Sequence, residues 1–141
     1  MDTQTGSRSL LTEPLVKFFR GRNFAFLGTL NKDGSPQVTP TWVDIEEKDH
    51  EEMILVNTAM DRVKQKNVSR DPRVSISIVD KDNPYSMVTI KGRVRTHRQA
   101  CKEISQYPVH SPNVKRIILK IKPEKIFYIP PRYEEYLRKI K

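Results

Sequence analysis

Alternation of apolar and polar residues is the main pattern along the chain, and it predicts a protein built mostly of β-strands. Residues 73–79 place Val74, Ile76 and Ile78 opposite two serines. Residues 87–96 continue the pattern as a longer strand. One face of that strand carries Val88, Ile90, Gly92 and Val94, and the other carries Lys91, Arg93 and Arg95. We therefore expect two half-buried strands here.

The region from Phe24 to Val43 predicts a β-hairpin. An apolar strand over 24–30 is followed by the turn residues Asn31–Gly34 and by a second strand over 36–43. Pro40 cannot donate a hydrogen bond to a neighbouring strand, so it implies an edge strand or a bulge. A bulge would expose backbone groups to a planar polar ligand, whereas an ordinary edge strand needs no ligand. The pattern leaves both interpretations open.

The stretch before Pro72 carries the main functional prediction. The apolar run Met53–Val56 predicts a strand that leads Asn57 and Thr58 into a turn. A short helix should begin near Ala59 and end before the proline. Helix starts bind anions, because their backbone N–H groups are unpaired and the helix dipole is positive there.

Two cations, Arg62 and Lys64, fall in the predicted first turn of this helix. Cations are unfavourable beside the positive end of a helix, so we expect an anion to compensate them. The combination of strand, polar turn and helix start therefore predicts a phosphate site.

The alternative is a surface helix without a ligand. In that interpretation Met60, Val63 and Val68 face the core and the basic residues face solvent. Lys66 and Arg70 are expected to face solvent in either case.

The remaining segments complete a β-rich barrel with accessory helices. Thr12 and Pro14 predict the start of a helix that ends near Gly21. The other predicted segments are an acidic loop over 44–52, a polar loop over 80–84, a short helix and Pro-containing loop over 98–112, two strands over 117–121 and 125–129 around a turn at 122–124, and a terminal helix over 132–141. The predicted fold class is mainly β, with about seven short strands.

Length and charge limit the classes of function. The chain has 141 residues, enough for one domain with a proper core. It carries no apolar run long enough to span a bilayer and no signal-peptide segment, which predicts a cytoplasmic protein. The net charge of +9 favours anionic partners such as phosphates, nucleotides and nucleic acid. The basic residues are scattered and form no nucleic-acid motif, so nucleic-acid binding is a secondary hypothesis.

The sequence contains few side chains with catalytic potential. His50, His97 and His110 lack the spacing of metal ligands, and Cys101 is the single cysteine, so no metal site is predicted. No Walker loop, Gly-x-Gly-x-x-Gly or Gly-x-Ser-x-Gly motif is present. Catalytic residues therefore stay unknown. A predicted phosphate site without such residues suggests that a cofactor supplies the reactivity.

Five blocks of the sequence resemble the pyridoxamine 5′-phosphate oxidase-like superfamily, and most of all its branch of deazaflavin-dependent enzymes. They are FAFLGTLNKDGSPQVTPTW at 24–42, VNTAMDRVKQKN at 56–67, RDPRVS at 70–75, NPY at 83–85 and IKGRV at 90–94. The resemblance covers residues 11–97 and resumes at 117–129.

This resemblance implies an FMN-binding split β-barrel of Greek-key type. A disordered tail over 1–10, a cofactor-binding barrel over 11–130 and a basic C-terminal helix or tail over 131–141 would make up the chain. FMN or the 5-deazaflavin coenzyme would bind at the interface of a homodimer. The family pattern assigns the phosphate to Asn57, Thr58, Arg62 and Lys64, with Val63 in the same segment, and the ring to Val38, Thr39, Pro40, Thr41 and Trp42.

Three functional hypotheses follow, in order. The first is an oxidoreductase that passes hydride between the cofactor and a small organic substrate. The second is a non-catalytic carrier of a flavin or tetrapyrrole, and the third is a nucleic-acid-binding protein. The segment 98–113 is shorter than in the family, which puts the substrate in doubt. The longer tail of the deazaflavin would need basic contacts, for which Arg73, Lys91 and Arg93 are the candidates.

Overall fold

The computed structural model describes residues 2–4, 13–48, 51–59, 63–99 and 116–129. The helices are α1 (Glu13–Arg20) and α2 (Val63–Arg70). The strands are β1 (Asp2–Gln4), β2 (Ala25–Leu30), β3 (Pro36–Thr41), β4 (Val43–Lys48), β5 (Glu51–Ala59), β6 (Arg73–Val79), β7 (Met87–Gln99) and β8 (Arg116–Ile129). Neither described helix is long and apolar enough to cross a membrane.

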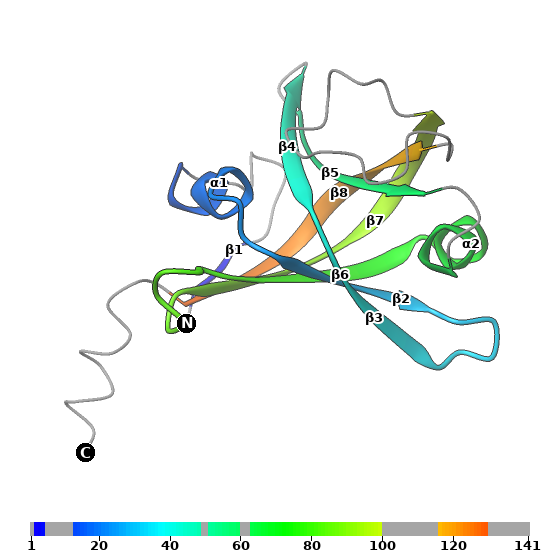
Figure 1. Cartoon of the computed structure of the whole chain (residues 1–141), viewed down its shortest axis with the longest axis horizontal. Coiled ribbons are helices and arrows are strands. Elements are labelled where there is room, and N and C mark those ends of the chain that lie inside the picture. Colours follow the sequence, from blue (N-terminus) through cyan, green and yellow to red (C-terminus); the bar gives the residue numbers. More distant parts are fainter. Residues whose placement is uncertain (1, 5–12, 49–50, 60–62, 100–115, 130–141) are drawn as a thin grey trace.

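All the described strands belong to one antiparallel sheet that curls into a half-barrel (Figure 1). The order is β3-β2-β6-β7-β8-β5-β4, and β1 pairs with β8 beside this path. The two outermost strands of the path, β3 and β4, follow each other in the chain and are joined by Trp42 alone. The predicted mainly β, split-barrel fold is confirmed.

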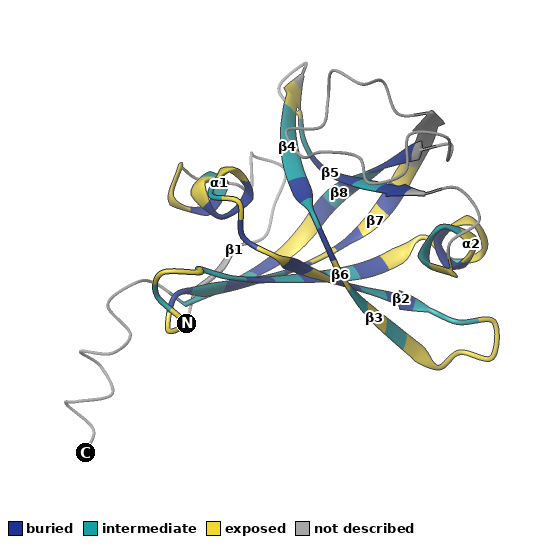
Figure 2. Cartoon of the chain, in the orientation of Figure 1, coloured by how far each residue is buried: buried dark blue, intermediate teal, exposed yellow. Residues whose placement is uncertain are grey.

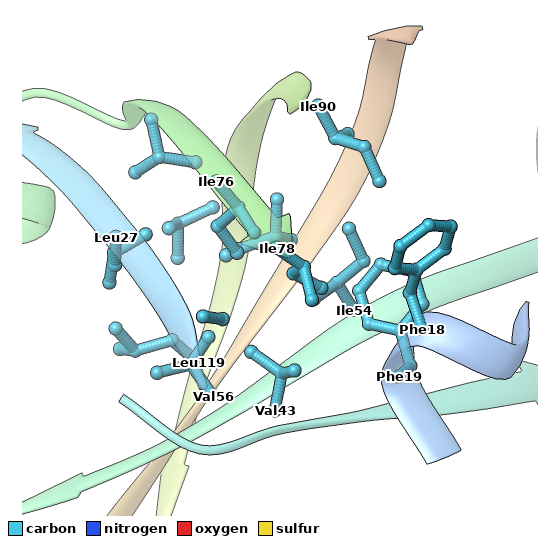
Figure 3. Close-up of a cluster of buried hydrophobic side chains, with 14 of the residues drawn as sticks. Phe18, Phe19, Leu27, Val43, Ile54, Val56, Ile76, Ile78, Ile90 and Leu119 are labelled. Carbon is cyan, nitrogen blue, oxygen red and sulfur yellow. The ribbon is translucent and has the colours of Figure 1, made fainter. Parts of the chain in front are cut away.

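The core fills the concave side of the sheet (Figures 2 and 3). Alternate residues of β2, β6 and β7 point inward, as the sequence predicted for β6 and β7, whereas β5 and β8 each bury three consecutive residues, 54–56 and 117–119. Helix α1 covers one end of this core with Leu15, Phe18 and Phe19, and the Phe18 ring packs edge-on against Tyr128 at 5.9 Å. The predicted helix before Gly21 is confirmed, and so is the hairpin, although β3 ends at Thr41.

The acidic loop predicted over 44–52 is wrong. Residues 43–48 form β4, which pairs with the first part of β5. Val43 is buried and Ile45 packs against the core, while the charged residues alternate with them. Glu46 accepts a hydrogen bond from Lys120 of β8 at 2.6 Å. Charged side chains are common on edge strands because they discourage pairing with other chains, and here they hid the strand pattern.

The turn predicted at 122–124 is also wrong, because β8 runs through it as one bent strand. Pairing with β7 shifts there: Gly92 lies opposite Pro123 and Lys91 opposite Lys125, so Glu124 is an extra residue. A bulge of this kind accommodates a proline that cannot donate to the ladder. A side chain at Gly92 would collide with the Lys122 carbonyl oxygen, which explains the glycine.

Three smaller differences concern segment ends. Residues 2–4 of the predicted disordered tail form β1 and pair with 126–128. Residues 57–58 continue β5 instead of forming a turn, and residues 98–99 of the predicted short helix continue β7. The rest of that helix, and the predicted helix over 132–141 with the tail that contains it, lie outside the described residues.

Candidate functional site

The β2–β3 hairpin presents exposed apolar side chains on the side of the sheet opposite the core. The side chains of Phe24, Phe26 and Val38 are 54%, 43% and 62% exposed. The Trp42 ring stacks on Phe24 with 4.1 Å between centroids. Because β2 turns Ala25, Leu27 and Thr29 inward, the period of the strand forces its phenylalanines outward. Large exposed aromatic residues in such a group mark a binding surface.

This surface becomes polar and then basic across the neighbouring strands. One row of paired residues runs from Pro40 through Phe26, Ser77 and Thr89 to Phe127. The Ser77 and Thr89 hydroxyls share a hydrogen bond of 2.7 Å. The ammonium groups of Lys91 and Lys125 lie 5.9 and 5.3 Å from the centre of the Phe127 ring. The apolar part is thus confined to the β3 side of the sheet.

Strand β3 forms the free edge of the described sheet, which confirms the edge interpretation of Pro40. Its register with β2 is continuous from Pro36 to Thr41, so the predicted alternative of a bulge is wrong. The Thr39 hydroxyl oxygen is buried and has no hydrogen-bond partner within the described structure. The Thr41 hydroxyl donates a long hydrogen bond of 3.5 Å to the Trp42 carbonyl. A buried hydroxyl without a partner is unfavourable, so Thr39 indicates a place where a ligand group could bind.

The predicted phosphate residues lie on β5 and α2. Thr58 is buried and Asn57 is half-buried in the last part of β5, paired with Ile117 and Ile118. Helix α2 begins at Val63 in the described structure, and Lys64 is its second described residue. Arg62 lies outside the described residues.

Helix α2 matches neither sequence interpretation completely. Val63 is 53% exposed, although the surface-helix alternative placed it in the core, while Val68 is buried as that alternative predicted. Lys66 and Arg70 are exposed, as expected. The first turn of α2 contains no acidic residue, so nothing in it opposes an anion at the helix start.

Sequence reasoning missed the residue that fastens α2 to the hairpin. Asn67 is 3% exposed, and its amide nitrogen donates to the Thr29 hydroxyl and to the Asn31 side-chain oxygen, both at 2.9 Å. Its amide oxygen accepts a hydrogen bond from Arg70 at 2.9 Å. The partners on β2 and its turn are 38 and 36 residues away, so no local pattern could have revealed them. Figure 1 shows α2 at the same end of the sheet as the hairpin turn.

The carboxyl groups with lowered pKa values lie beside the predicted site, not in it. Hydrogen bonds from the Arg73 side chain and backbone lower the pKa of Asp71 to about 2. Hydrogen bonds from Ser35 lower the pKa of Asp33 in the hairpin turn. Neither carboxyl is therefore tuned as a proton donor or acceptor near neutral pH. Within the described ranges, no three His, Cys, Asp or Glu side chains lie close enough together to hold a metal ion.

A hollow of about 180 Å³ lies at the other end of the half-barrel, next to α1. Its lining residues are Pro14, Lys17, Phe18, Asp80, Ser86 and Tyr128. It contains none of the predicted cofactor residues. The candidate site therefore consists of the predicted residues on β3, at the end of β5 and at the start of α2; β3 lies close to β5, and α2 lies close to β2, the partner of β3.

Solved structures of the same fold come from several proteins. An F420 reductase is 24% identical over 75% of this chain and 90% of its own, with a TM-score of 0.62. HupZ from Group A Streptococcus is 17% identical over 85% and 94%, with a TM-score of 0.65. General stress protein 26 from Bacillus anthracis is 17% identical over 82% and 90%, with a TM-score of 0.60. Identities this low show the shared fold alone.

The similarity also holds at the level of sequence, because the chain matches the profile of a protein family. The profile described as pyridoxamine 5′-phosphate oxidase matches residues 11–130, which is most of the chain. With the split-barrel topology and the edge strand now described, the match assigns the family: the chain belongs to the pyridoxamine 5′-phosphate oxidase family.

Proposed function

We propose that this protein is a flavin- or deazaflavin-dependent oxidoreductase that transfers hydride between the bound cofactor and a small organic substrate. The observation that carries the proposal is the edge of β3. There the exposed Val38 and Pro40 flank Thr39, whose buried hydroxyl has no hydrogen-bond partner in the described structure. Val38 and Pro40 lie on one face of β3 and Thr39 on the other, because successive side chains of a strand alternate. A ligand bound at this edge could bond to the Thr39 hydroxyl on one face, and the apolar side chains could cover a ligand on the other. An ordinary protein surface rarely leaves a buried hydroxyl without a hydrogen-bond partner.

The residues fit a phosphate-bearing cofactor. Asn57, Thr58, Arg62, Val63 and Lys64 are proposed to hold the phosphate, and Val38, Thr39, Pro40, Thr41 and Trp42 to line the ring. The start of α2 supports this role, because its first backbone N–H groups have no partner inside the helix and its first turn has no acid. When bound, a flavin or deazaflavin supplies the hydride chemistry itself. The chain's own residues would bind and orient the cofactor and keep water from one side of it.

The identity of the cofactor stays open between FMN and the 5-deazaflavin coenzyme. The F420 reductase among the structural neighbours is consistent with the second. Of the candidates for its longer tail, Arg73 and Arg93 are opposite each other in β6 and β7. They form ion pairs with Asp71 and Glu124, at 2.7 and 3.3 Å, which an acidic tail would have to replace. Cytoplasmic location also stays a prediction.

The deciding experiment is a titration of the purified protein with each cofactor, followed by fluorescence quenching. Arg62→Ala and Lys64→Ala should each raise the Kd for the bound cofactor about tenfold or more, the loss expected for a charge-assisted hydrogen bond. Lys66→Ala is the matched control, because Lys66 is an exposed lysine on the same helix. Binding of neither cofactor by the wild-type protein would overturn the proposal.

A carrier protein without turnover is the second candidate. It is favoured by the residue types of the predicted site, none of which carries a carboxyl group that could donate or accept a proton. Absorbance of the reduced cofactor, recorded with a panel of small hydride acceptors, separates the two functions. Tight cofactor binding without oxidation by any acceptor would favour the carrier. Steeply salt-dependent binding of single-stranded DNA, without cofactor binding, would favour the nucleic-acid hypothesis.

We also propose a homodimer, with a second copy covering the apolar part of the convex face. Exposed aromatic side chains at this density are typical of interfaces. Phe26→Glu, at the centre of the apolar row, should shift the protein from dimer to monomer in sedimentation velocity. Lys32→Glu, in the exposed hairpin turn, is the control for added negative charge. A wild-type protein that sediments as a monomer at high concentration would contradict this.

A further inference from the structure

We infer that Asn67 is a positioning residue, which sets the start of α2 against the β2–β3 hairpin. This inference rests on the proposed function, because it connects the segment proposed to hold phosphate with the strand proposed to line the ring. Asn67 itself is not proposed to touch the cofactor, since its side chain is buried and both its amide nitrogen and its amide oxygen are hydrogen-bonded within the protein.

The argument begins with how little apolar contact holds α2. Val68 is its one buried apolar side chain, and Val63 points to solvent. Apolar contact is non-directional, so a single valine cannot fix the rotation and tilt of a two-turn helix. Hydrogen bonds have preferred lengths and angles, and the buried ones therefore decide the placement.

The bonds of Asn67 reach both parts of the hairpin. Thr29 is a buried residue of β2 that pairs with Gln37 of β3, the neighbour of Val38. Asn31 opens the turn, and its own amide nitrogen donates to the Ser35 hydroxyl at 3.2 Å. One amide thus joins α2 to β2 directly and to the start of β3 through a single further residue.

The same amide controls the proposed phosphate end of the helix. Lys64 precedes Asn67 by three residues, and residues at this spacing lie on the same side of a helix. A rotation of α2 about its axis at Asn67 therefore moves the Lys64 side chain by a similar angle. Arg70, one turn later, donates to the Asn67 oxygen and, at 3.5 Å, to the Leu30 carbonyl. These contacts with the hairpin lie in the second turn of α2, at Asn67 and Arg70, and the helix carries their effect to Lys64 in its first turn.

The hydrogen-bond pattern requires an amide at position 67. An aspartate cannot donate to Asn31, whose side-chain nitrogen is already directed to Ser35. A leucine of similar size would leave Thr29, Asn31 and Arg70 without their shared partner. Loss of the amide should therefore let α2, with the proposed phosphate residues, move relative to the β2–β3 hairpin.

The test compares FMN with riboflavin, which has the same ring and no phosphate. If Asn67 positions the phosphate segment, Asn67→Ala raises the Kd for FMN about tenfold and changes the Kd for riboflavin less than about twofold. The phosphate-free deazaflavin chromophore replaces riboflavin if the wild-type protein prefers the deazaflavin coenzyme. Ser69→Ala is the control, because Ser69 bonds only to Gln65 within the exposed side of α2 in the described structure.

Thr29→Val is the second variant, in case Asn67→Ala does not fold. It removes one acceptor of the Asn67 amide from the hairpin side without changing the volume. It should give the same selective loss of FMN affinity, and the double variant should lose less than the sum of the two. An equal loss for FMN and riboflavin, or no loss for either, would overturn the inference. A wild-type protein that binds neither compound would instead overturn the proposed function, and the inference with it.

Discussion

The two helices attach to the same sheet by opposite means. Helix α1 buries Leu15, Phe18 and Phe19 over one end of the core. Helix α2, of the same length, buries Val68 and the polar Asn67 at the other end. The first attachment is a broad apolar contact, whereas the second is a small set of hydrogen bonds with fixed geometry.

The magnitudes show what each attachment provides. Burial of one large apolar side chain contributes about 1.5–3 kcal/mol to stability. A typical hydrogen bond within a protein contributes only about 0.5–1.5 kcal/mol net. The contacts of α1 therefore contribute mainly to stability. The hydrogen bonds of α2 contribute less to stability but fix the position of the helix on the sheet. This is the division expected if α1 closes the barrel and α2 serves the proposed site.

The largest expected effect is the loss of stability when a buried side chain of α1 is truncated. Phe19→Ala should lower the free energy of unfolding in urea by about 3–5 kcal/mol, because it leaves a cavity under the helix. Val68→Ala, the matched truncation on α2, should cost about 2 kcal/mol. Neither should change the ratio of FMN to riboflavin affinity in the folded fraction. A Val68→Ala loss as large as that of Phe19→Ala would contradict the contrast between the helices.

The smallest expected effect concerns the junction of α2 with β6. The pKa of Asp71 is about 2, below its ordinary value of 3.8, chiefly because the Arg73 side chain donates to it. A lowered pKa means that this contribution to stability is present above about pH 4 and is lost as the pH falls toward 2. Asp71→Asn should therefore reduce the melting temperature slightly at neutral pH, and the difference should vanish near pH 2.

The Arg73 side chain is exposed and Asp71 is only half-buried, so a small effect is expected in any case. Asp82→Asn, in the exposed loop between β6 and β7, controls for the lost charge. A difference between the wild-type protein and Asp71→Asn that grows as the pH falls would show that the sign is wrong.

Local patterns in the sequence predicted the elements that have one apolar and one polar face. The hairpin of β2 and β3, the alternation in β6 and β7, and α1 all follow from residue periods and turn chemistry. Strand β4 was missed because its glutamates suggested a loop, although Val43 and Ile45 alternate with them. The bend of β8 was interpreted as a turn because Pro123 breaks strands in most settings.

The candidate site was less predictable than the fold. The edge position of Pro40 could be inferred, since proline in a sheet implies a free edge. The unpartnered Thr39 hydroxyl and the Asn67 network depend on which distant strands meet, and a single sequence does not contain that information. Asn67, in a polar helix with Lys64, Lys66 and Arg70, has the same local pattern as a solvent-facing residue.

The long β8 also has a consequence for how the chain is made. It pairs with β1, β5 and β7, and it is the last described strand in the sequence. During synthesis the earlier hairpins can form on their own. Strands β1, β5 and β7 cannot pair fully with β8 until residue 129 has left the ribosome. Until then their edges are open to pairing with other chains, so a longer interval raises the chance of aggregation before the sheet is complete.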